Sequence, residues 1–208
     1  MRGAGPLSRL LGFIRDLRRL ARIANAHSIA RRMFVTNAFD GLLAALGVVM
    51  GLYATHSMDA RVYVYGVLGE SIAMGVFSGM IATYFSERAE RLRELHEIER
   101  AVLHELDNSI YGKTARYVPL YVALWSGAGA TLLPVLGVTP LTIALLLGVP
   151  AMGLPVYLSV AMILAELFII GFYLGRISGE NSLLNGLKLA GIGLAAAATL
   201  FMLKMMLP

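Results

Sequence analysis

The chain has no cysteine and few charged residues, and these two scarcities narrow its class. Without a thiol, neither a disulfide framework nor a thiolate metal site is possible. Charged residues make up 15% of the 208 residues, against about 25% in an average soluble domain. Hydrophobic residues reach 58% and the mean hydropathy is +0.71. These values point to an integral membrane protein.

The chain also lacks the usual catalytic motifs. Two His-Glu pairs, at 96–97 and 104–105, would need a second histidine at 100 and 108 to form the HExxH zinc-protease motif, but Arg100 and Asn108 stand there. There is no Walker A loop, no GxSxG sequence and no dinucleotide fingerprint in a soluble setting. We therefore do not expect an enzyme, and no cofactor is implied.

Five apolar segments are long enough to cross a bilayer core of about 30 Å, which takes about 20 helical residues. They are residues 34–54, 62–85, 117–138, 154–175 and 186–207. The sequence therefore predicts an all-α membrane protein with five transmembrane helices. The apolar stretch at 139–153 is too short to cross alone, and either a re-entrant piece or a kinked start to the fourth span fits it.

The basic residues are distributed unevenly between the two sides of these spans. Of the 18 Lys and Arg, only Arg61 and Lys204 fall on the side that carries the C-terminus. By the positive-inside rule, the N-terminus is cytoplasmic and the C-terminus external. The net charge of +5 is thus explained by topology, and no nucleic-acid partner is expected.

Four segments follow from this organisation. Residues 1–32 form a basic amphipathic juxtamembrane segment, which we interpret as an ordinary anchor on the anionic inner leaflet rather than as a specific lipid or nucleic-acid site. Residues 33–85 hold the first two spans, and 86–113 form a charged cytoplasmic helix that continues from the second span. Residues 114–208 hold the last three spans.

One carboxylate, Asp40, lies in the first apolar segment. An unpaired aspartate in the hydrocarbon core costs at least about 2.5 kcal/mol, so something must use or compensate it. On a helical wheel its side of the helix is small and polar, whereas the opposite side suits lipid or protein core. That small side carries Thr36, Asn37, Asp40, Ala44, Gly47, Gly51 and Ala54. We interpret the segment as a lining helix, with Asp40 near the cytoplasmic end of the span.

Two further acids, Glu70 and Glu166, lie in the second and fourth spans. Acids in a membrane rarely face lipid, so we expect each of them to have a function or a buried partner. Met74 follows Glu70 by one helical turn, and a thioether beside a carboxylate suits a transition metal. Filling a gap in the packing is nevertheless the commoner role of a methionine.

The charged helix after the second span carries a row of acids on one side. Its members are Glu87, Glu90, Glu94, Glu97 and His104. Carboxylates that end in a histidine can bind hard or borderline divalent cations. The alternative is a solvated charged face held by ion pairs three or four residues apart, such as Glu90 with Arg93 and Glu97 with Arg100.

The segment FDGLLAALGVVMGLYA resembles the first transmembrane helix of the vacuolar iron transporter family, to which the yeast vacuolar cation carriers belong. The residues that match in type and order are Asn37, Asp40, Gly41, Gly47, Val48, Val49 and Gly51. GVFSGMIATYFS, at 75–86, is similar to the family's second helix, with Gly79 at the family's methionine position and Thr83 at its glutamate position. The order of elements agrees over about 34–207.

The resemblance implies a homodimer in the lipid bilayer, with a cation path near the subunit interface that the first helices line. It implies export of Fe²⁺ or Mn²⁺ from the cytosol in exchange for protons, across the plasma membrane of a prokaryote, with Asp40 in the pathway. A non-transporting membrane interaction or lipid-organising protein of the same fold is the alternative, with its acids in buried pairs.

Overall fold

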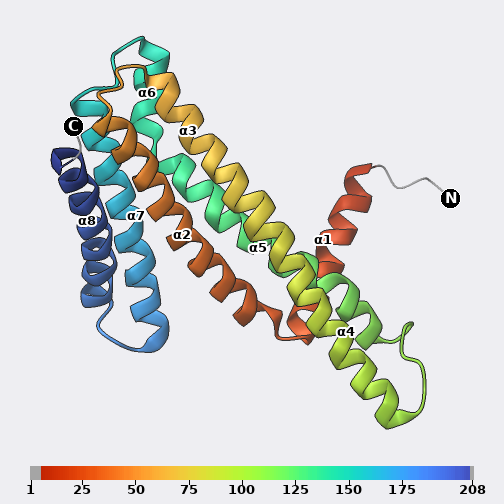
Figure 1. The fold of residues 1–208 in the computed structure, drawn as a ribbon. Coiled ribbons are helices and arrows are strands. Elements are labelled where there is room, and N and C mark those ends of the chain that lie inside the picture. Colours follow the sequence, from red (N-terminus) through yellow and green to blue (C-terminus); the bar gives the residue numbers. More distant parts are fainter. Residues whose placement is uncertain (1–5, 207–208) are drawn as a thin grey trace.

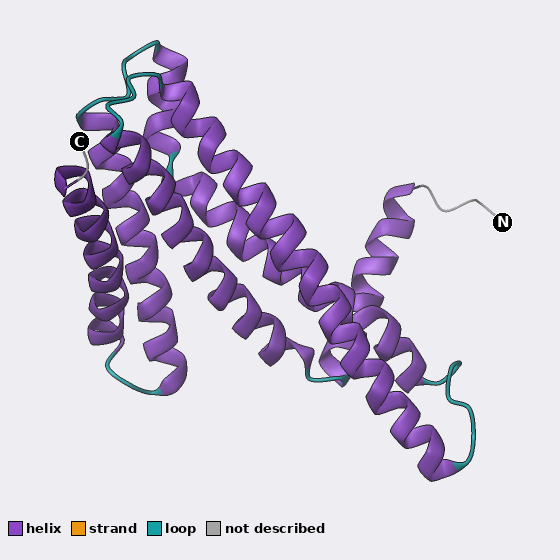
Figure 2. Ribbon diagram, viewed as in Figure 1, coloured by secondary structure: helices purple, strands orange, loops and turns teal. Residues whose placement is uncertain are grey.

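The computed structural model describes residues 6–206, and every regular element in that range is helical (Figure 2). Residues 1–5 of the predicted juxtamembrane segment and residue 207 of the fifth predicted span lie outside it. The elements are α1 Pro6–Ile23, α2 Ala26–Ala54, α3 Ala60–Ile72, the π-helix η1 Ala73–Ala82, α4 Thr83–Val102, α5 Ile110–Gly137, α6 Thr139–Leu147, α7 Leu154–Ser178 and α8 Ser182–Met206.

Five helical stretches are long and apolar enough to cross a membrane, which is the number that the sequence predicts. They are Ala26–Ala54, Ala60–Val102, Ile110–Gly137, Leu154–Ser178 and Ser182–Met202. Large apolar side chains on their outer faces, such as Phe77, Ile169 and Leu187, are each more than 60% exposed. Exposed apolar surface of this extent suits contact with lipid, so the architecture is that of a multi-pass membrane protein.

The long pair α2 and α5 forms the centre of the molecule (Figure 1). The continuous rod of α3, η1 and α4 packs along α5, while the hairpin of α7 and α8 packs against α2. Leu42, Leu46 and Val49 of α2 are fully buried in the core between these two groups. The α2–α3 connection and α6 lie at one end of the bundle, and the tip of α4 and the α7–α8 turn lie toward the other (Figure 1).

Local signals set the helix boundaries. The side chain of Asp59 caps α3 by accepting a hydrogen bond from a backbone N–H two residues later, and Ser109 caps α5 in the same way. Leu103, Gly148 and Gly179 have positive φ angles and end α4, α6 and α7. Because α4 ends at Val102, the prediction that 86–113 forms one charged helix is wrong beyond that residue, and Ile110 already begins α5.

Two other predicted boundaries change. The helix of the first span begins at Ala26 rather than near residue 34, so the segment predicted at 1–32 divides between α1 and the first turns of α2. Asn25, with φ 51°, separates them, and α1 leaves in a different direction to pack on α5 (Figure 1). At 139–153, α6 is a separate short helix that ends before Gly148, so it is not a kinked start of α7.

Candidate functional site

Asp40 lies at the middle of α2, with fourteen helical residues on either side of it. Its side chain is exposed on the surface of the chain, and within the described residues it has no hydrogen bond or ion pair. On the same face, a side chain added at Gly47 or Gly51 would meet nothing within 4 Å. The predicted small face is therefore open at Asp40, Gly47 and Gly51.

Asn37, three residues earlier, points into the bundle instead. Its amide nitrogen donates to the hydroxyl of Ser126 on α5 (3.0 Å) and to the carbonyl of Met33 (2.9 Å). The Ser126 hydroxyl donates to the carbonyl of Gly79 (2.8 Å) and lies 2.9 Å from that of Thr83. Since its one proton is used on Gly79, the Thr83 hydroxyl is the donor between the two. A closed network of neutral groups thus joins α2, α5 and the second span.

The sequence did not identify Ser126, which is fully buried and is the shared partner in this network. The only signal for it is its place at the start of a run of small residues in α5. Gly79 and Thr83, at the ligand positions of the family that the sequence resembles, both bond to the Ser126 hydroxyl, which also accepts from Asn37. In this chain, however, they contribute a backbone carbonyl and a hydroxyl rather than a thioether and a carboxylate.

The second span changes from α-helix to π-helix between Glu70 and Thr83. This π-helix, η1, packs closely on α5, where a side chain at Gly75 would collide with Thr131 and one at Gly127 would lie 2.8 Å from the Gly75 carbonyl. The Thr131 hydroxyl donates to the carbonyl of Gly127 (2.8 Å). π-Helical turns are rare and frequently occur at functional sites, and this one follows directly on the helix that carries Glu70.

Glu70 and Glu166 are half-buried and incompletely satisfied. One carboxylate oxygen of Glu70 accepts from the Ser71 hydroxyl (3.3 Å), while its other oxygen, one oxygen of Glu166 and the hydroxyl of Ser159 are buried without a hydrogen-bond partner among the described residues. Neither acid is paired with a cation there. Met74 is half-buried on η1, next to this region in the chain.

Asp40, Glu70 and Glu166 do not form a shared metal-binding site among the described residues. In the part of the chain that the structure describes, no three His, Asp or Glu side chains come close enough to hold a metal ion together. Asp40, Glu70 and Glu166 lie on three different helices, α2, α3 and α7. A site of three such side chains that includes Asp40 would therefore need a ligand from outside the described residues.

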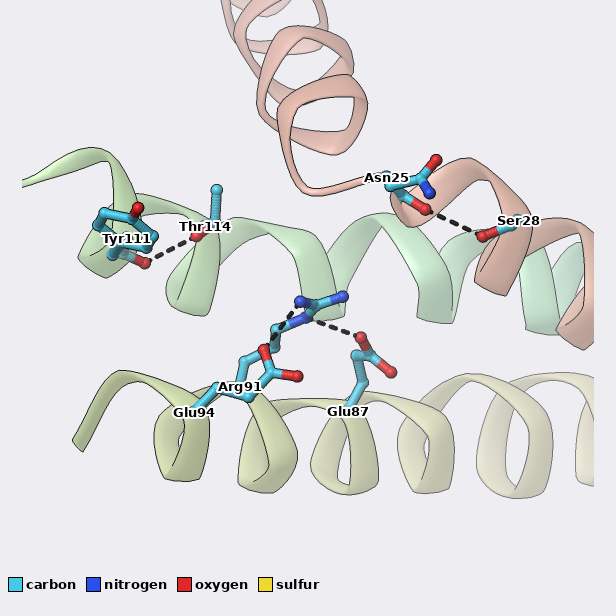
Figure 3. A network of polar contacts seen from close by, with 7 residues as sticks. All are labelled: Asn25, Ser28, Glu87, Arg91, Glu94, Tyr111 and Thr114. Atoms are coloured by element: carbon cyan, nitrogen blue, oxygen red, sulfur yellow. Dashed lines mark hydrogen bonds and ion pairs between the residues drawn. The ribbon is translucent and has the colours of Figure 1, made fainter. Parts of the chain in front are cut away.

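The acidic row on α4 is largely engaged in ion pairs. Arg91 binds Glu87 (3.0 Å) and Glu94 (2.9 Å), and Arg93 binds Glu97 (3.0 Å). The pairs are three and four residues apart, as the alternative interpretation expects, although the partners differ from those predicted. Figure 3 shows the Arg91 guanidinium directed from α4 toward α5, with a carboxylate on either side.

Two members of the predicted row are outside these pairs. Glu90 is exposed, with no ion pair in the described range. His104 follows the left-handed residue that ends α4, so it is not on the helical face of the glutamates. The Glu99 carboxylate accepts from the backbone N–H of Leu106 (2.8 Å) and holds the α4–α5 connection.

Comparison with known proteins gives a relative from Methanocaldococcus jannaschii, described as the uncharacterized protein MJ0645. The two sequences are 32% identical over 198 residues, which is 94% of this chain and 98% of the relative. The similarity thus extends over nearly the full length of both chains. No family model and no solved structure matches this chain.

Proposed function

The chain belongs to the family of the uncharacterized protein MJ0645, and we propose that it is a five-span carrier that exports divalent Fe²⁺ or Mn²⁺ from the cytosol in exchange for protons. The observation that carries this proposal is Asp40: a carboxylate on an open face of α2, a helix long and apolar enough to cross a membrane, without a partner among the described residues. The N-terminus is then cytoplasmic, and the membrane is the plasma membrane of a prokaryote.

A second copy of the chain would cover the exposed Asp40 carboxylate and shield it from lipid. Facing lipid, the charged aspartate would cost at least about 2.5 kcal/mol. In a two-fold homodimer the same surface meets itself, so contact through the open face of α2 brings two Asp40 carboxylates together. Gly47 and Gly51 let the two backbones approach closely.

Two carboxylates in a low-dielectric interface need positive charge, which accounts for the proposed cargo and coupling. One divalent cation neutralises the pair, and protons do so when the metal has left. Release of the metal is therefore coupled to uptake of protons by the carboxylates. Met74 can add a soft ligand, and Glu70 and Glu166, with their unpartnered oxygens, are the further proton sites. Glu87, Glu90, Glu94 and Glu97 of α4, with His104 just beyond its end, are proposed to collect metal on the cytosolic side.

Metal flux into proteoliposomes with an imposed pH gradient tests the proposal. We expect Asp40→Asn to lower Fe²⁺ and Mn²⁺ flux at least tenfold, because the amide cannot balance a dication or exchange a proton. Asp59→Asn is the matched control, since Asn also serves as the N-cap of α3 and the site lies in a connection. Equal flux for wild type and Asp40→Asn, with unchanged pH dependence, would refute the central role of Asp40.

The alternative function, a non-transporting membrane interaction or lipid-organising protein, is favoured by one observation. The positions that carry ligands in the resembling family are occupied here by Gly79 and Thr83, in a closed network of neutral groups. The same assay discriminates between the two functions: this alternative gives wild-type flux at the level of empty liposomes. Anomalous scattering from metal-soaked crystals provides a second test, because the carrier places a metal near Asp40 and the alternative places none.

A further inference from the structure

A groove of about 430 Å³ lies between α1 and the start of α5, away from the Asp40 face of α2. Its apolar wall includes Leu20 and Ile23 of α1 and Tyr117 of α5, and its basic residues are Arg19 and Lys113. Among the side chains that the structure describes, no acidic residue lines it. The groove combines two cations with an apolar surface on an element that the sequence presents only as a general anchor.

Neither of the two cations has an ionic partner among the described residues. Arg19 and Lys113 are exposed, and neither forms an ion pair or a hydrogen bond with the described side chains. On α4, by contrast, Arg91 and Arg93 both hold glutamates. Lys113 also lies in the first turn of α5, where the helix dipole adds positive potential. No described side chain supplies the complementary negative charge.

The position of the groove identifies the source of that charge. α5 continues from Ile110 without interruption as a membrane-length helix, so its first turns lie where headgroups meet acyl chains. The half-buried side chains of Leu20 and Tyr117, together with exposed Ile23, give an acyl chain a surface directly beside the cations. A free phosphate would leave that apolar wall unused.

We propose that this groove binds one anionic phospholipid, with its phosphate between Arg19 and Lys113 and an acyl chain against Leu20 and Ile23. Bound there, the lipid fixes α1 on α5 at the membrane surface. This site is independent of metal transport, because none of its residues belongs to the α2 face or to the acid row.

Native mass spectrometry of the full-length protein in detergent, titrated with phosphatidylglycerol, tests this site. The test variant is Arg19→Gln with Lys113→Gln, and the control is Arg22→Gln with Arg116→Gln. The control removes the same charge from the same two helices at exposed positions outside the groove. Each basic side chain near an anionic lipid strengthens binding about fivefold, so the test variant is expected to bind about thirty-fold more weakly. The control should stay within about twofold of wild type.

Parallel titrations with phosphatidylcholine and inorganic phosphate define the ligand, and neither should give the one-lipid complex or displace phosphatidylglycerol. Equal weakening of test and control variants would show general surface attraction and overturn the proposal, as would full competition by phosphate or no retained lipid in wild type. If the double variant does not fold, the single variants Arg19→Gln and Lys113→Gln serve instead. Each is then expected to weaken binding about fivefold, against no change for Arg22→Gln.

Discussion

Gly41 offers a sharp test of the packing that places Asp40. It follows Asp40 on α2 and faces α5, where an added Cβ would lie 2.9 Å from the carbonyl oxygen of Ala130, 3.1 Å from its Cα and 3.0 Å from Cγ of Pro134. Two of these atoms are backbone and the third belongs to a rigid ring. To restore an ordinary contact of 3.4 Å, α2 and α5 must separate by about 0.5 Å at their crossing.

Gly41→Ala is therefore expected to destabilise the protein, because overpacking of this kind costs about 1–3 kcal/mol. Alanine also favours the helix by up to about 1 kcal/mol relative to glycine, which partly offsets the clash. Gly191→Ala on α8 gives the same helix gain with open space around the new methyl group. The difference between the two variants thus isolates the cost of the clash, about 1–3 kcal/mol.

Thermal unfolding in detergent, followed by the fluorescence of Trp125, measures that difference. Trp125 is the only tryptophan and its ring lies 5.8 Å from that of Phe34, so it reports on the α2–α5 contact. For a chain of this size, Gly41→Ala should have a Tm about 2–12 °C below that of Gly191→Ala. A Tm equal to or above that of Gly191→Ala would show that α2 and α5 do not pack as described.

Gly51→Ala adds a test of the dimer: it should behave like Gly191→Ala in the monomer and shift the equilibrium away from dimer.

Two further substitutions test polar contacts on other elements, again by thermal unfolding. Arg91→Gln should lower the stability by about 1–3 kcal/mol, because Arg91 and Glu87 are only 16% and 14% exposed and the glutamate is left without its partner. Arg93→Gln removes an ion pair of the same length, but Arg93 is 70% exposed, so its Tm should stay unchanged. Equal effects of the two substitutions would contradict the burial of the Arg91–Glu87 pair. Ser126→Ala should lower stability by about 1–3 kcal/mol, because the fully buried Ser126 hydroxyl takes part in three hydrogen bonds. Ser28→Ala removes one exposed bond and should not lower stability. Unchanged stability of Ser126→Ala would contradict the network.

The number of spans could be predicted from the sequence because hydrocarbon imposes a simple requirement. A helix that crosses it needs about 20 apolar residues, and such runs are easy to recognise in a chain with 15% charge. The ends of the helices depend on single residues and were less predictable. Leu103 has a left-handed backbone conformation, which is unusual for leucine and cannot be predicted from its side chain. The helix ends there, so His104 does not lie on the face that carries the glutamates.

The network around Ser126 could not be predicted, because its members are far apart in sequence. Asn37 and Ser126 are 89 positions apart, and only the parallel packing of α2 on α5 brings them within 3.0 Å. The π-helix could not be predicted either, since its residues have the composition of an ordinary apolar helix. Its position follows from tertiary contacts, where Gly75 and Gly127 let the second span approach α5 closely.

The periodicity of the sequence could not predict the surroundings of Asp40. The sequence identifies its face as small and polar, but it does not tell whether that face packs inside the chain or remains open. Lipid and protein core are similarly apolar, so the usual contrast between a buried and a solvated face is lost. The contacts of Gly41 with α5 settle the question, because they turn Asp40 outward. A charge placed outward at the middle of a membrane-length helix is stable only if something outside the chain balances it. The activity we propose is for this reason a property of two chains and a cation together.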